Sequence, residues 1–256
     1  MTVVAAPWPG TLYGSALSRR TVTCAKSIKY RFFELVSVRS GLIRAPSKKP
    51  PIAFADYGRM FRVIFSVLEA HTEVHSACIA FSMIGAHLLR RHYKLQANAV
   101  GGAAAYALGH NFKVLTFGKI EDGCLIAAPD GFHCWIECNG YIIDFLSPLF
   151  RDKIAEHDDS AAVPRRVFMK PLSLMSPALP QRSDIEGTFQ LVASGERTEK
   201  MVQSFYETKR AQDLQAICES WYCRPPKRIT PQLAIRDDLY NITHLRLRGP
   251  EIAGFW

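Results

Sequence analysis

The feature that most constrains the fold is an Asn139-Gly140 pair that separates two apolar runs. Such a pair predicts a two-residue β-hairpin turn, because a type I′ turn needs a positive φ at both central residues. The register of the hairpin follows from the turn and places Trp135 opposite Asp144. Since side chains alternate between the two faces of a strand, His133 shares a face with Asp144 as its diagonal neighbour. We therefore expect an imidazole beside a carboxylate on one stiff hairpin.

A histidine held in this way can act as an acid–base group. A carboxylate that binds one ring nitrogen fixes the tautomer of the imidazole and stabilises its protonated form. The nucleophile for such a pair is expected from elsewhere in the chain. Cys134 and Cys138 lie in the hairpin, but they alternate with His133 and are expected to be packed rather than reactive.

The candidate nucleophile is Cys78, in the first turn of a helix predicted over 76–91. Ser76 is the predicted N-cap, and the helix is apolar or small nearly all round, which is typical of a helix buried in the centre of a domain. Free amides and the positive end of the helix dipole lower the pKa of a thiol at this position. Cys78, His133 and Asp144 are therefore the candidate catalytic residues, with the amide of Cys78 directed at a developing oxyanion.

The surrounding pattern predicts an α+β fold. A helix that carries Phe61, Ile64 and Leu68 on one face precedes the Cys78 helix, with Asp56 as its cap and an end near His71. Short β-like runs then alternate with turns, which predicts an antiparallel sheet. Besides the arms of the hairpin, these runs are 95–100, 103–108, 112–117 and 124–128.

Composition limits the classes of function. The chain has 256 residues and 48% hydrophobic residues, and it contains no apolar run long enough to span a membrane. The net charge is +9, but residues 1–50 hold nine Lys or Arg and one acid, so the remaining body is close to neutral. We expect no nucleic-acid or membrane partner for that body. Seven cysteines in a chain of this length favour free thiols in the reducing cytoplasm over a disulfide framework.

Three regions are expected along the chain. Residues 1–50 are predicted to be a basic, poorly ordered extension, and residues 51–150 a catalytic core. Residues 151–256 are predicted to be a C-terminal addition packed on that core. Within it, 151–187 is expected to form long surface loops, 196–221 one amphipathic helix, and the tail no regular structure.

Four features of the core belong together: the Cys78 helix, the strand 97–102, the sequence His133-Cys134-Trp135-Ile136-Glu137, and Asp144 before Ser147-Pro148. With these features the core resembles the transglutaminase-like superfamily of papain-like thiol enzymes, and it is similar to arylamine N-acetyltransferases. The resemblance covers about residues 55–150, and it implies Cys78 as nucleophile, His133 as base and Asp144 as the orienting group. It also implies a buried helix that carries the cysteine, packed on an antiparallel sheet that carries the histidine and aspartate.

The function expected from these residues is acyl transfer or amide hydrolysis through a Cys78 thioester, with a peptide, amide or acyl substrate and no cofactor. Hydrolysis is favoured because water is always present as an acceptor. His75 and Trp135 are candidates for oxyanion or substrate contacts, with core packing as the alternative for Trp135. Two other classes stay open. One is a non-catalytic binding module on the same fold, and the other is a zinc site formed by His71, His75 and Cys78.

Overall fold

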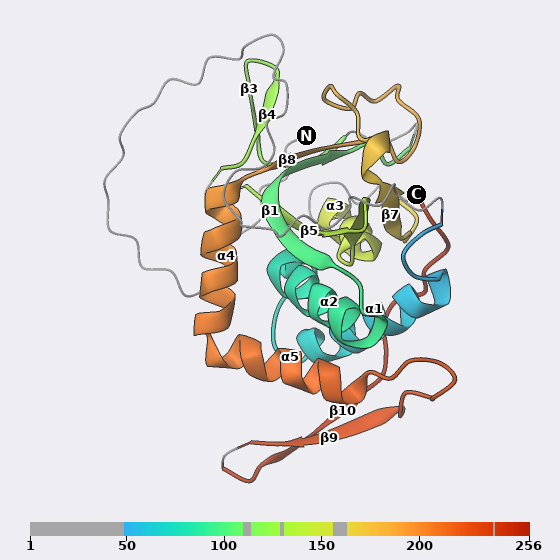
Figure 1. The fold of residues 1–256 in the computed structure, drawn as a ribbon, viewed down its shortest axis with the longest axis vertical. Helices are drawn as coiled ribbons and strands as arrows, with labels where there is room; N and C mark the ends of the chain where they lie inside the picture. The colour runs from blue at the N-terminus through green and yellow to red at the C-terminus, as the bar shows by residue number, and fades with distance from the viewer. Residues whose placement is uncertain (1–48, 110–113, 129–130, 156–162, 238) are drawn as a thin grey trace.

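Five α-helices pack on a curled antiparallel sheet that forms half a barrel in the described part of the chain (Figure 1). The computed structural model describes residues 49–109, 114–128, 131–155, 163–237 and 239–256, so the predicted basic extension lies almost wholly outside the described residues. The expected α+β class is confirmed. The helices are α1 (Phe54–Glu69), α2 (Cys78–Tyr93), α3 (Phe150–Ala155), α4 (Gly195–Glu207) and α5 (Lys209–Trp221).

The main sheet has six strands, and its central strand is β1. The first half of β1 pairs with β5, and its second half pairs with β2 and β8, while β6 and β7 extend the sheet beyond β5. Strands from both sides of residue 150 therefore belong to one sheet. The strands are β1 (Ala97–Tyr106), β2 (Leu115–Phe117), β5 (His133–Cys138), β6 (Tyr141–Asp144), β7 (Phe168–Pro171) and β8 (Phe189–Ala193).

Two small hairpins and three short 3-10 turns complete the described chain. The hairpin of β3 and β4 projects at the top of Figure 1, and that of β9 and β10 lies below α5. These strands are β3 (Lys119–Glu121), β4 (Cys124–Ile126), β9 (Gln232–Arg236) and β10 (Ile242–Arg246), and the turns are η1 (Val74–Ser76), η2 (Ser147–Leu149) and η3 (Leu172–Leu174). None of the described helices is long and apolar enough to cross a membrane.

The hairpin predicted from Asn139-Gly140 is confirmed. Both turn residues have positive φ, 50° and 79°. The register is the expected one, with Cys138 opposite Tyr141 and Ile142 opposite Glu137. The turn chemistry and the apolar arms thus define β5 and β6 locally.

The prediction of two strands over 95–100 and 103–108 was wrong, because one strand runs straight through Gly101-Gly102. A Cβ at Gly102 would collide with the carbonyl oxygen of Val192 and with the ring of Trp135. The glycine is therefore needed for the close approach of neighbours inside a strand, and it does not mark a turn.

The C-terminal predictions were also partly wrong. The supposed loops over 151–187 contain α3 and β7, and the single helix expected over 196–221 is divided at Thr208, which has extended backbone angles. The tail forms the hairpin of β9 and β10. These elements gain their order from long-range pairing and packing, which local periodicity does not record.

Helix α2 lies in the curve of the sheet, with α1, α4 and α5 around it (Figure 1). Its buried side chains join the single large core. Gly85 faces the sheet, where an added Cβ would meet the ring of Phe145 and the side chain of Ile136. The absence of a side chain there allows the helix to approach β5 closely, and this sets the position of the Cys78 end of the helix.

Candidate functional site

Cys78 is the first residue of α2 and retains 5% exposure. The predicted cap was wrong: the N-cap is Ala77, and no side chain caps the helix there. Ser76 instead belongs to η1, and its hydroxyl accepts a hydrogen bond from Lys153 Nζ at 3.5 Å. The first-turn amides of α2 thus have no side-chain acceptor at the cap, and the positive end of the helix dipole lies at the thiol.

His133 is the first residue of β5 and is fully buried. Its ring stacks on Phe117, with ring centroids 4.3 Å apart. The pairing of β1 explains this contact, since Gly102 pairs with His133 and Ala104 pairs with Phe117 two residues further along the same strand. The imidazole therefore has one face fixed by an aromatic ring.

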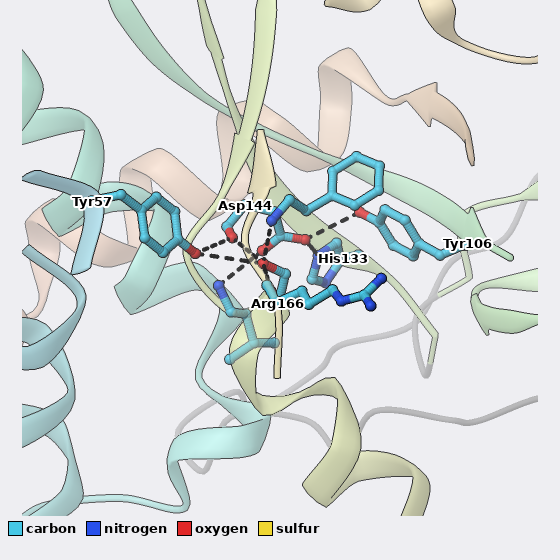
Figure 2. A network of polar contacts seen from close by, with 8 residues as sticks. Tyr57, Tyr106, His133, Asp144 and Arg166 are labelled. Carbon is cyan, nitrogen blue, oxygen red and sulfur yellow. Dashed lines mark hydrogen bonds and ion pairs between the residues drawn. The ribbon is translucent and has the colours of Figure 1, made fainter. Parts of the chain in front are cut away.

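Asp144 ends β6 and is also fully buried. Its Oδ2 lies 2.6 Å from His133 Nε2 and accepts a hydrogen bond from the Tyr106 hydroxyl at 3.1 Å, while Oδ1 accepts from the Leu146 amide at 2.9 Å (Figure 2). The contact between His133 and Asp144 that the hairpin register predicts is thus confirmed. Three donors around one buried carboxylate hold it in place and compensate for its burial.

The backbone at Asp144 is fixed by a second set of hydrogen bonds (Figure 2). Its carbonyl oxygen accepts from the Tyr57 hydroxyl at 2.7 Å and from Ser147 Oγ at 2.8 Å. Ser147 Oγ in turn accepts from the Phe168 amide at 2.8 Å, so α1, β6 and β7 meet at this point. The carboxylate is therefore positioned by the body of the fold and not by a loop.

The Cys78 thiol interacts with two side chains of β5, His133 and Cys134, although these point to opposite faces of the strand. Because Cys78 begins α2 and His133 begins β5, these interactions bring the starts of the two elements together. His133 Nε2 is held by Asp144, and its Nδ1 is buried with no well-formed hydrogen bond among the described residues. Nδ1 is therefore the nitrogen left to face the sulfur of Cys78.

These contacts produce opposite pKa shifts in the thiol and the imidazole. A hydrogen bond from Cys134, and then the interaction with His133, outweigh burial and lower the pKa of Cys78 to about 5. Burial lowers the pKa of His133, but the charge and hydrogen bond of Asp144, together with Cys78, outweigh it and raise this pKa to about 9. At neutral pH these directions favour a thiolate beside an imidazolium.

The two predicted substrate-contact residues lie in different surroundings. His75 is in η1, with a side chain 27% exposed and Nε2 4.0 Å from Glu73 Oε2. Trp135 is fully buried, and its Nε1 donates to Glu137 Oε1 at 3.4 Å. Their roles toward a substrate stay predictions.

The zinc alternative gains no support. His71 follows the end of α1, and His75 lies in η1 before α2, so no single helix joins them to Cys78. Within the described ranges, no group of three or more His, Cys, Asp or Glu side chains is arranged to hold a metal ion.

Comparison with known proteins places the chain in a family. A family model described as "Protein of unknown function (DUF2026)" matches residues 53–256. The chain belongs to the DUF2026 family. A solved structure described as "The crystal structure of genomics APC5867" is 31% identical in sequence, with a TM-score of 0.71. The match covers 82% of the present chain and 99% of that one. No curated protein matches the chain.

The part of this DUF2026 chain that the family model matches includes Cys78, His133, Asp144 and the strands on both sides of residue 150. Sequence reasoning missed Tyr106 as a donor to Asp144, because the two residues are 38 positions apart and only the curl of the sheet joins them. It also treated Cys134 as packing alone. A signal was present, since the face of β5 opposite His133 had to be covered by the helix that carries Cys78.

Proposed function

We propose that this DUF2026 protein is a cysteine-nucleophile enzyme that transfers or hydrolyses acyl groups. The observation that carries the proposal is the sequence of contacts Cys78–His133–Asp144, in which a carboxylate fixes one nitrogen of the imidazole and a thiol faces the other. We further propose that the Cys78 helix and the sheet are the helix-and-sheet core of the papain-like and transglutaminase-like enzymes.

In the first half of the reaction, the Cys78 thiolate attacks the carbonyl carbon of the acyl substrate. The resulting oxyanion is received by the first-turn amides of α2, where the dipole favours negative charge. The His133 imidazolium gives its proton to the leaving group, and a thioester forms on Cys78. Asp144 keeps Nε2 in a hydrogen bond throughout, so Nδ1 is the nitrogen that carries the transferred proton.

In the second half, neutral His133 takes a proton from water or from another acceptor, which attacks the thioester and releases Cys78. His133 and Asp144 are fully buried, whereas Cys78 retains slight exposure. An acyl group therefore approaches from the side of the thiol. Hydrolysis needs no second binding site, and it is the reaction we propose by default.

The test is acylation by p-nitrophenyl acetate, followed by release of nitrophenolate and by mass spectrometry of peptides. We expect a burst of nitrophenolate and one acetyl group on the Cys78 peptide. Cys78→Ala should abolish the burst. Cys138→Ala is the matched control, because Cys138 is a buried cysteine of the same hairpin whose pKa is raised by burial alone, and this variant should leave the burst intact. Acetyl groups spread over several cysteines, with none enriched on Cys78, would reject the proposal and favour the binding module.

A further inference from the structure

A second thiol, Cys134, lies at the candidate site and has no role in the acyl-transfer steps. It follows His133 in β5, is fully buried, and points to the face of the strand that α2 covers. Its side chain forms a hydrogen bond with the Cys78 thiol. The two sulfurs are therefore neighbours, and a disulfide requires them to approach each other to about 2 Å.

The proton of Cys134 has two possible acceptors. Cys134 Sγ lies 3.0 Å from Met201 Sδ of α4, and it also faces Cys78. A thiol has one proton, so it donates to one acceptor at a time, and an anionic thiolate accepts more strongly than a thioether. Cys78 is the sulfur with which Cys134 can react, because the thioether of Met201 has no thiol group to form a disulfide.

The other buried cysteines offer no such pair. Burial alone raises the pKa of the Cys138 thiol to about 11 and that of the Cys218 thiol well above its ordinary value, with no second thiol involved. Burial also raises the pKa of the Cys134 thiol, but there Cys78 is the next cause. All six described cysteines are free in the structure. A low-pKa thiolate next to a second thiol is the arrangement in which oxidation proceeds to a reversible disulfide.

We propose that Cys134 is a resolving cysteine, which forms a reversible disulfide with Cys78 when a hydroperoxide oxidises the site. The proposal rests on the same Cys78 thiolate as the proposed function, and it adds a modification that switches off and protects the nucleophile. Its oxidant is a hydroperoxide, and its reductant is a dithiol.

The chemistry balances in two steps. The Cys78 thiolate attacks the outer oxygen of the hydroperoxide, the O–O bond breaks, and the alkoxide or hydroxide takes a proton from the His133 imidazolium, leaving a sulfenic acid on Cys78. Cys134 sulfur then attacks Cys78 sulfur, the S–O bond breaks, and the departing hydroxide leaves as water with the Cys134 proton. In total the two thiols lose two electrons, and one hydroperoxide is reduced to an alcohol and a water molecule, or to two water molecules for hydrogen peroxide.

The experiment treats the full-length protein with hydrogen peroxide and maps the cysteines by mass spectrometry before and after dithiothreitol. In the wild type we expect a Cys78–Cys134 crosslinked peptide and a loss of Cys78 alkylation that dithiothreitol restores. In Cys134→Ala we expect a sulfenic acid that dimedone traps, followed by sulfinic acid, and recovery of alkylation at least ~10-fold lower than in the wild type. Cys138→Ala, altered on the same face of the same strand, should behave as the wild type.

Two further measurements separate the possible failures. Circular dichroism and a second variant, Cys134→Ser, show whether loss of recovery reflects a misfolded protein. Acylation by p-nitrophenyl acetate is measured on the same samples. Acylation without a Cys78–Cys134 crosslink, with sulfinic acid appearing equally in wild type and Cys134→Ala, would overturn the resolving role but not the proposed function. A crosslink without acylation would overturn the proposed function and keep the resolving role.

Discussion

At the scale of single residues, the hydroxyl of Tyr106 helps to hold the buried Asp144 carboxylate in its contact with His133. It donates to the same Oδ2 that contacts His133. The Tyr57 hydroxyl donates to the backbone carbonyl of the same aspartate. The two tyrosines therefore form a natural pair of variants. Tyr106→Phe removes a buried hydrogen bond to the carboxylate, whereas Tyr57→Phe removes a buried hydrogen bond to the backbone carbonyl and a 3.4 Å contact with Ser147 Oγ.

We expect Tyr106→Phe to raise the pKa of His133 and Tyr57→Phe to leave it unchanged, as measured by NMR titration of the ring protons. A carboxylate that loses one hydrogen-bond donor interacts more strongly with its remaining partner, the imidazolium, and this interaction raises the pKa of His133. Each variant should lose about 1 kcal/mol of stability for its buried hydrogen bond. Equal effects of the two variants on the His133 pKa would show that Tyr106 supports the fold alone.

At the scale of elements, the position of Cys78 depends on how closely α2 approaches the sheet. We expect Gly85→Ala to lower the free energy of unfolding by about 1–3 kcal/mol, because the new methyl group meets Phe145 and Ile136. The measurement is urea unfolding. Gly58→Ala in α1 is the control, because a Cβ there meets no atom within 4 Å, and alanine should stabilise that helix by about 0.5–1 kcal/mol. A neutral Gly85→Ala would contradict the close approach of α2 to β5.

The same scale shows what the sequence could and could not predict. The hairpin of β5 and β6 is encoded locally by Asn139-Gly140 and by alternation, so both its register and the approach of His133 to Asp144 could be predicted. The buried helix of Cys78 was recognisable from its composition. Strands β7 and β8 were missed because they depend on partners far away in the chain. Gly101-Gly102 was misread as a turn, because the close approach of Val192 and Trp135 excludes a Cβ at Gly102 inside the strand.

At the scale of the whole molecule, the thiol and the imidazole couple stability to pH. In the folded protein the pKa of Cys78 is about 5, below its ordinary value of 9.0. Its contribution to the free energy of unfolding is therefore fully present above pH 9.0 and is lost as the pH falls through 5. In the folded protein the pKa of His133 is about 9, above its ordinary value of 6.5. Its contribution to the free energy of unfolding is therefore fully present below pH 6.5 and is lost as the pH rises through 9. Between pH 6.5 and 9 the two effects cancel, because the pair carries one proton in both the folded and the unfolded chain.

A net effect appears only between pH 6.5 and 5, where the unfolded pair binds two protons and the folded pair binds one. We expect the wild type to lose on the order of 2 kcal/mol more than Cys78→Ala across this window. Urea unfolding of both proteins at the two pH values measures the difference. Equal losses in the two proteins would mean that Cys78 is a neutral thiol when folded.

The most direct test of the central claim is the rate of iodoacetamide alkylation at Cys78 as a function of pH, measured residue by residue on native protein. A thiolate paired with His133 predicts a midpoint near pH 5 in the native wild type and a return toward 9.0 in urea. His133→Gln should move the native midpoint upward, whereas Cys138→Ala should leave it unchanged. A Cys78 that resists alkylation until the protein unfolds, or that titrates near its ordinary 9.0 when folded, would contradict the thiolate–imidazolium pair and the acyl-transfer function built on it.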